Sequence, residues 1–229
     1  NFGFDELLLH EVAHEWWGNK ITVSDWADFW IHEGFAVYAE ALFVLDTLGE
    51  DRYIEYMARA RQQIENVEPL VRGKNLTPNQ AYSGDIYYKG AWVLHSLRWL
   101  VGDEGFFEIL WRFANDSEYA YGLVSSEDFA NLVFEVSGQD IDWFWERYLH
   151  RAEEPRWRVR RRLEGDWERF TITWDDRDFE MPLPVWVAGE EQRLGMSEGR
   201  ASFLVERGTR VEVDPLGQVL AQPSKRQTS

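Results

Sequence analysis

The chain has 229 residues, of which 45% are hydrophobic, and a formal net charge of −17. That length and apolar content suffice for one large domain or two small ones, and the acidic balance argues against nucleic acid or an anionic membrane as a partner. Without cysteine the chain has neither disulfides nor thiolate metal sites, so redox chemistry gives no information on its compartment. No apolar run reaches the roughly 18 residues of a membrane span.

The N-terminus carries no recognisable targeting sequence. The chain opens at Asn1 without methionine or a signal-like segment, so we expect it to be part of a longer protein whose N-terminal portion is missing here. The localisation stays unknown.

Hydrophobic periodicity predicts helices through the first two thirds of the chain. Gly49, Gly102 and Gly138 separate the periodic segments, and Ser125 with Asp128 fits a capping box. The expected helices span residues 5–17, 28–48, 51–67, 87–100, 104–115, 126–136 and 140–150.

At Pro155 the pattern changes to alternating apolar and polar residues, which is typical of half-buried strands. Gly, Asp and Pro turns separate these segments, and together they predict a small antiparallel β-sandwich over about 155–221. Residues 223–229 are expected to form a flexible tail. We therefore predict an α+β fold in two parts, with a mainly helical subdomain over residues 1–152 and a β-sandwich domain over residues 153–229.

The first predicted helix contains the sequence LLLHEVAHEWWG, with two histidines one helical turn apart. His10 and His14 leave the same face of the helix, so both imidazoles can reach one small ion. Glu11 lies about 100° further round, too far to chelate comfortably but near enough to act on a water at the ion. This HExxH pattern is the signature of zinc metallopeptidases, with the glutamate as general base. The alternative is that these are ordinary surface and core residues.

A third ligand is needed, because catalytic zinc normally has three protein ligands and one open position. Glu33 follows His14 after eighteen intervening residues, in the sequence WIHEGFAVYAE, whose apolar residues predict a helix with a well-buried side. A carboxylate on that side needs a partner, because burying an unpaired charge is costly. Zn²⁺ would be such a partner, and a salt bridge to an arginine is the alternative.

Together these two segments resemble the aminopeptidase-N-like family of zinc metallopeptidases, the gluzincins, whose third ligand is a glutamate. The family has Trp-x-Gly-Asn after the second histidine and Glu-Gly-Phe-Ala at the third ligand, and this chain has both. The resemblance implies a thermolysin-like helical catalytic subdomain before the β-sandwich, and one Zn²⁺ held by His10, His14 and Glu33. One departure is His32, where the family commonly has Asn. We interpret His32 as a neighbour of the site, since adjacent helical residues point in different directions.

A second shared motif lies in DIYYKGAWVL, residues 85–94. The family has Tyr-x-Lys-Gly at the start of a helix, and its tyrosine hydrogen-bonds the oxyanion of the tetrahedral intermediate. The matching residues are Tyr87, Lys89 and Gly90. A phenol suits this role, because it is neutral at pH 7 and its hydrogen can be aimed. The alternative is a core tyrosine.

The resemblance implies zinc-dependent hydrolysis of peptide substrates, as an aminopeptidase, with Glu11 as general base and Tyr87 as oxyanion donor. In the family, a Gly-x-Met-Glu-Asn motif before HExxH binds the free amine of the substrate, but the nine residues before His10 do not match it. Exopeptidase preference therefore rests on resemblance alone. Two alternatives stay open: another gluzincin hydrolase, such as an endopeptidase or epoxide hydrolase, and a non-catalytic peptide- or carbohydrate-binding module with a vestigial site.

Overall fold

The computed structural model describes residues 2–224, which divide into two compact units. The helical unit comprises the residues up to Ile141 together with Tyr148–Glu153, and the sheet unit comprises Asp142–Arg147 together with the residues from Glu154 onward. These units differ from the domains proposed from the sequence chiefly in residues 142–147, which belong with the sheets.

The prediction of a mainly helical part followed by an antiparallel sheet region is confirmed. Within residues 2–224, none of the helices combines the length and apolar character that crossing a membrane requires. The elements of the helical unit are α1 (Glu6–Ala13), β1 (Thr22–Val23), the 3-10 helix η1 (Trp26–Asp28), α2 (Trp30–Leu48), α3 (Glu50–Arg61), α4 (Pro78–Ala81), α5 (Asp85–Val101), α6 (Asp103–Asn115), β2 (Leu123–Val124), α7 (Ser126–Ser137) and the end of α8 (Asp142–Leu149).

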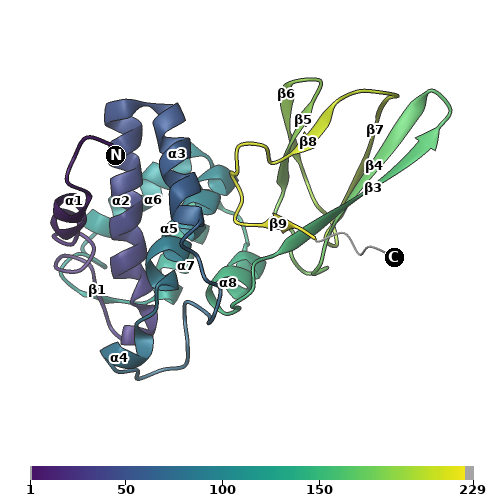
Figure 1. Ribbon diagram of the computed structural model, residues 1–229. Coiled ribbons are helices and arrows are strands. Elements are labelled where there is room, and N and C mark those ends of the chain that lie inside the picture. The colour runs from purple at the N-terminus through teal and green to yellow at the C-terminus, as the bar shows by residue number, and fades with distance from the viewer. Residues whose placement is uncertain (1, 225–229) are drawn as a thin grey trace. The chain divides into compact units, whose positions relative to one another are not determined.

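Helix α2 is the centre of the helical unit, where it packs against α1, α3 and α5 (Figure 1). Its first half is buried on nearly every side, as expected for a helix that is apolar all round. The ring of Phe35 contacts those of Trp17, Phe113 and Phe129, at centroid distances of 4.9, 6.0 and 5.1 Å. This aromatic cluster fixes the part of α2 that carries Glu33.

Helices α2 and α5 meet backbone to backbone at Gly34 and Gly90. A Cβ added to Gly34 would lie 2.8 Å from the Cα of Gly90, and one added to Gly90 would lie 3.0 Å from the Cα of Gly34. Neither position has room for a methyl group, so only glycine permits this separation of the helices. Because Gly34 follows Glu33 and Gly90 lies three residues after Tyr87, the crossing brings these two side chains to the same place.

Helix α1 is shorter than the predicted helix over residues 5–17, because the chain turns at His14. The carbonyl of His14 accepts a hydrogen bond from the amide of Asn19 at 2.9 Å. Gly18, with φ of 154°, lies against that carbonyl, and a Cβ there would be 3.0 Å from the oxygen. The turn after Ala13 thus folds the chain back over His14.

The helix predicted over residues 51–67 ends at Arg61, and the residues after it are held by the start of α5. The buried carboxylate of Asp85 accepts hydrogen bonds from the amides of Glu65 and Val67, at 2.8 and 3.2 Å. These bonds satisfy backbone groups that would otherwise continue a helix.

The sheet unit contains two sheets, with strand orders β7-β4-β3-β9 and β6-β5-β8 (Figure 1). The pairs are antiparallel except β3 with β9. β3 and β4 pair with Val159 opposite Ile172, which continues the alternation seen in the sequence. The strands are β3 (Arg156–Glu164), β4 (Trp167–Trp174), β5 (Leu183–Val187), β6 (Glu190–Leu194), β7 (Arg200–Glu206), β8 (Val211–Val213) and β9 (Gln222–Pro223).

The predicted flexible tail from Pro223 is wrong at its beginning. Pro223 belongs to β9 and lies opposite Trp157 of β3, and the amide of Ser224 donates to the Trp157 carbonyl at 2.8 Å. A proline is tolerated there because β9 is an edge strand and needs no hydrogen-bond donor on its open side. Residues 225–229 of that prediction lie outside the described residues.

The close contact of α2 and α5 can be tested by substitution. We expect Gly34→Ala to lower the free energy of unfolding of the helical unit by about 1–3 kcal/mol, because the new methyl group meets backbone that cannot rotate away. Urea denaturation followed by the helical circular dichroism signal measures this change.

A matched control is Gly105→Ala on α6, where the nearest atom to the new Cβ is 4.0 Å away. It should raise the stability by about 0.5–1 kcal/mol, the usual gain from replacing a helical glycine. Equal effects of the two substitutions would contradict the crossing as described.

Candidate metal centre

Two histidines and a glutamate, predicted as ligands, converge in the helical unit. His10 is on α1, His14 caps its C-terminal end, and Glu33 comes from the first turn of α2. The Nε2 atoms of the two histidines are 3.1 Å apart, and Glu33 Oε2 is 3.2 Å from that of His10 and 3.5 Å from that of His14. Within the described part of the chain, this is the one group of such side chains arranged so that it could hold a metal ion.

The other nitrogen of each imidazole is hydrogen-bonded to an oxygen. His14 Nδ1 lies 2.9 Å from the carbonyl oxygen of Trp17, and His10 Nδ1 lies 2.9 Å from Oε1 of Glu40. A carbonyl and a carboxylate can only accept, so both Nδ1 atoms carry hydrogen. In the neutral rings each Nε2 then presents a lone pair to the shared point.

This donor set fits a divalent cation such as zinc. Two imidazole lone pairs and a carboxylate oxygen face one another, an arrangement that needs either protons or a cation between them. Tetrahedral zinc with bonds of about 2.0–2.1 Å has neighbouring ligand atoms about 3.3 Å apart. The three separations, 3.1, 3.2 and 3.5 Å, are close to that value.

The electrostatics of the cluster show how strongly it favours positive charge. Burial disfavours the charged imidazole and by itself would lower the pKa of His10, but hydrogen bonds to Glu33 and Glu40 raise that pKa to about 9. A hydrogen bond to Glu33 also raises the pKa of His14. Burial alone would raise the pKa of Glu33, but the two histidines lower it to about 2. Protons thus occupy the site at neutral pH unless a cation displaces them.

His32, next to Glu33 in sequence, faces away from the ligand atoms. It is buried, and its Nε2 accepts a hydrogen bond from the amide of Val23 at 3.0 Å. Burial lowers the pKa of His32 to about 4, so the ring is neutral at pH 7 and can accept. Its role is to attach strand β1 to helix α2.

Tyr87 lies beside the ligands on the first turn of α5. Its ring stacks on that of His10 at a centroid distance of 5.9 Å and an angle of 25°. Burial, with the nearby Tyr82 and Glu33, raises the pKa of Tyr87 above its ordinary value of 10. The hydroxyl therefore keeps its hydrogen at neutral pH, and it donates a long hydrogen bond of 3.4 Å to the Tyr82 hydroxyl.

Glu11 is the one predicted site residue that the structure does not bring into contact with the others. It lies on the exposed side of α1, and among residues 2–224 it makes no hydrogen bond or ion pair. Its carboxylate is therefore accessible to solvent.

A cavity of about 390 Å³ opens beside the cluster. His10, Glu40, Tyr56 and Tyr87 contribute to its wall. One edge of His10 and the ring of Tyr87 are thereby exposed to a molecule that enters from solvent.

Sequence reasoning missed the two groups that orient the imidazoles. Glu40 lies seven residues after Glu33, and positions seven apart fall on the same face of a helix. A second acidic residue on the buried face was therefore a signal that could have identified it. The backbone carbonyl of Trp17 could not be identified from residue types, since every residue has such a carbonyl and only the turn at Gly18 places this one beside His14.

Comparison with protein families gives one match that covers most of the helical unit. Residues 4–148 match the family model described as Peptidase family M1 domain. That segment contains all five residues predicted for the site.

Several curated relatives match over most of this chain, and two of them show the similarity. It is 27% identical to Aminopeptidase N of Streptomyces lividans over 233 residues, which cover 94% of this chain and 27% of that protein. It is 25% identical to a leucyl aminopeptidase of Saccharolobus solfataricus, with 82% of this chain and 26% of that protein covered. The chain spans about a quarter of the length of these relatives.

Solved structures show the same fold. Aminopeptidase A of Legionella pneumophila, in complex with aspartic acid, superposes on 96% of this chain with a TM-score of 0.81, at 19% identity and over 27% of its own chain. An M1 zinc metallopeptidase from Deinococcus radiodurans covers 66% of this chain with a TM-score of 0.55 at 30% identity, over 34% of its own chain.

Proposed function

The chain belongs to the M1 peptidase family, as its motifs predicted, and we propose that it provides the metal centre and catalytic residues of a zinc-dependent aminopeptidase. One observation carries this proposal. Two imidazole nitrogens and a carboxylate oxygen converge within 3.5 Å of one another, and both imidazoles are held by hydrogen bonds at their other nitrogen. The names of the two relatives described above supply the reaction class, since both are called aminopeptidases.

His10, His14 and Glu33 would hold the ion, each through the atom that faces the shared point. Zinc bound there would act as a Lewis acid on a water molecule and on the carbonyl of the bond to be cleaved. The chain contributes a ligand set without cysteine, which is typical of catalytic and not of structural zinc sites. The hydrogen bonds that His10 Nδ1 donates to Glu40 and that His14 Nδ1 donates to the Trp17 carbonyl keep both rings in the orientation and tautomer that such binding needs.

Glu11 would be the general base. Its exposed carboxylate, which follows His10 directly on α1, would accept a proton from the attacking water and later return it to the leaving nitrogen. Its accessibility and its place in the HExxH pattern support this assignment.

Tyr87 would donate a hydrogen bond to the oxyanion that forms on the scissile carbonyl. The neutral phenol is stacked beside His10 and its hydrogen bond to Tyr82 is long, at 3.4 Å, so its hydrogen can turn toward that charge. A donor of this kind typically contributes about 3 kcal/mol to the stabilisation of the transition state.

The substrate would be a peptide with a free amino terminus. This chain has no match to the motif that binds the amine, and the relatives are about four times as long. We therefore assign amine recognition to a part of the protein outside this chain. In support, α1 and the turn after it carry an exposed apolar surface on the same segment as His10 and His14, made by Leu7, Leu8, Val12 and Trp16, which are 70%, 62%, 46% and 49% exposed.

Zinc binding should depend on pH, because protons compete for the same nitrogens. His10 has a pKa of about 9 without metal, so below pH 9 at least one proton must leave when zinc binds. We expect the apparent affinity to rise about tenfold per pH unit for each proton displaced, and to level off above about pH 9. Competition with a chelator at several pH values, corrected for protonation of the chelator, measures this slope. A slope of zero between pH 6 and pH 8 would be inconsistent with the proposed ligands.

The role of Glu11 can be separated from metal binding. In the full-length protein, Glu11→Gln should reduce turnover of an aminoacyl arylamide by about 10²–10⁴-fold, because the amide cannot take the proton. Zinc content, measured by elemental analysis, should stay at the level of the unsubstituted protein. Loss of zinc from this variant in proportion to activity would count against the base assignment.

The role of Tyr87 predicts a specific kinetic pattern. Tyr87→Phe should lower kcat about 10²–10³-fold with little change in KM, because the lost bond forms only in the transition state. Tyr88→Phe removes the hydroxyl of the adjacent tyrosine, whose ring contacts Tyr87, and should change kcat little. An unchanged kcat in Tyr87→Phe would rule out the oxyanion role.

A further inference from the structure

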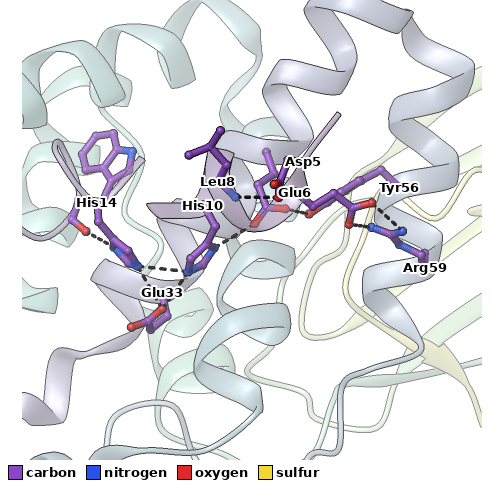
Figure 2. A network of polar contacts seen from close by, with 10 residues as sticks. Asp5, Glu6, Leu8, His10, His14, Glu33, Tyr56 and Arg59 are labelled. Atoms are coloured by element: carbon purple, nitrogen blue, oxygen red, sulfur yellow. Dashed lines mark hydrogen bonds and ion pairs between the residues drawn. The ribbon is translucent and has the colours of Figure 1, made fainter. Parts of the chain in front are cut away.

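A chain of polar contacts continues from His10 away from the ligand atoms and links three helices. Figure 2 shows His10 with His14 and Glu33 on one side and Tyr56 and Arg59 on the other. The link is Glu40 of α2, whose Oε1 is 2.9 Å from His10 Nδ1 and whose Oε2 accepts a hydrogen bond of 2.8 Å from the Tyr56 hydroxyl. Both oxygens of this buried carboxylate are therefore engaged.

Tyr56, on α3, is held in place from both sides. Only 3% of it is exposed. Its ring contacts the ring of Phe2 at a centroid distance of 5.4 Å, and the guanidinium of Arg59 lies 5.2 Å from its ring centre. Arg59 in turn forms a two-pronged ion pair with Glu6 of α1. The hydroxyl of Tyr56 thus has a fixed position, set by α1 and α3 together.

The bond from Tyr56 determines which way the Glu40 carboxylate faces. Burial and the neighbouring Glu40 raise the pKa of Tyr56, so its hydroxyl remains a donor. With Oε2 bound to Tyr56, Oε1 is turned toward His10 Nδ1. Without that bond, Oε2 would be a buried acceptor with no hydrogen-bond partner among the described side chains, an unfavourable arrangement that favours rotation of the carboxylate.

The two histidines differ in this respect. His14 is oriented by the backbone carbonyl of Trp17, which no side-chain replacement at that residue removes. His10 is oriented by a side chain, Glu40, whose own position depends on another side chain. The orientation of His10, unlike that of His14, can therefore be changed by substituting a side chain outside the cluster.

We propose that Tyr56 is a positioning residue for His10, acting through Glu40, and that it thereby sets the affinity of the site for its divalent cation. This inference rests on the proposed function, because it requires that His10 is a metal ligand. It adds a residue three contacts from the ion whose loss weakens metal binding without removing a ligand.

The test compares two tyrosines on the same helix. Tyr56→Phe should weaken zinc binding about tenfold, in the range found when the groups that orient metal ligands are lost. Tyr53→Phe is the matched control, because Tyr53 also bears a buried, hydrogen-bonded hydroxyl on α3, but its partners are Tyr38 and His95. It should change zinc affinity less than twofold. Competition with a chelator measures both, and the visible absorption of bound Co²⁺ should shift in Tyr56→Phe alone.

A second comparison tests whether Tyr56 acts through Glu40. Glu40→Gln should weaken zinc binding by itself, and adding Tyr56→Phe should then cost little more, since residues acting in one chain are not additive. Independent, multiplicative effects of the two substitutions would overturn the proposal. So would a zinc affinity of Tyr56→Phe equal to that of Tyr53→Phe.

Failure of the inference can be told apart from failure of the metal site itself. Glu33→Ala should abolish zinc binding if the ligand assignment is right. If the unsubstituted protein binds no zinc, the proposed function fails and this inference with it. If zinc binds and Glu33→Ala removes it while Tyr56→Phe does not weaken its binding, only this inference fails.

Should Tyr56→Phe fold poorly by circular dichroism, Glu6→Gln replaces it, because that substitution weakens the ion pair that attaches Arg59 to α1. A zinc affinity at least about threefold weaker then supports the proposal, and an unchanged one overturns it.

Discussion

The backbone contact between α2 and α5 at Gly34 and Gly90 is the constraint on which the site depends. Two helices normally keep their axes 8–10 Å apart, at a distance set by the side chains between them. With no side chain at either position, the turns that carry Glu33 and Tyr87 lie next to each other. The glycines of the two motifs therefore have a geometric purpose, although neither touches the ligand atoms.

A second constraint concerns the imidazoles. Each histidine offers its Nε2 only because its Nδ1 is bonded elsewhere, and the two bonds differ in kind. The acceptor for His14 belongs to the same turn of chain and forms when that turn folds. The acceptor for His10 lies on α2 and is held by α3, so that ring becomes oriented only when three helices have packed.

The same packing explains the charge of the cluster. A carboxylate and two imidazoles are enclosed with few exposed atoms, and the pKa values of His10 and Glu33 move apart, to about 9 and about 2. The residues thus hold a positive charge at their centre, as protons or as a metal ion. If these side chains hold a metal ion, as we propose, the folded helices have already brought them together before the ion binds.

Much of this could be predicted from the sequence where the determining contacts are local. Residues four apart on a helix share a face whatever surrounds them, so His10 and His14 could be paired from spacing alone. Alternation after Pro155 likewise indicated strands, because the side chains of a strand point to opposite faces in turn. Strand β6 could not be recognised in this way, because its residues Glu190–Leu194 are almost all polar and show no apolar alternation. The end of α1 at Ala13 was not predicted either, because the turn depends on the hydrogen bond from the amide of Asn19 to the carbonyl of His14.

The sequence by itself determined the chemistry available to this protein: two imidazoles, a buried carboxylate, an accessible glutamate and a phenol. Only the tertiary structure decided which atoms of those groups face one another, and which residues hold them there. Glu40 is thirty residues from His10, and Tyr56 is sixteen from Glu40. Contacts over such separations are fixed by how helices pack, and packing depends on the shapes of many side chains at once, which no single spacing along the chain records.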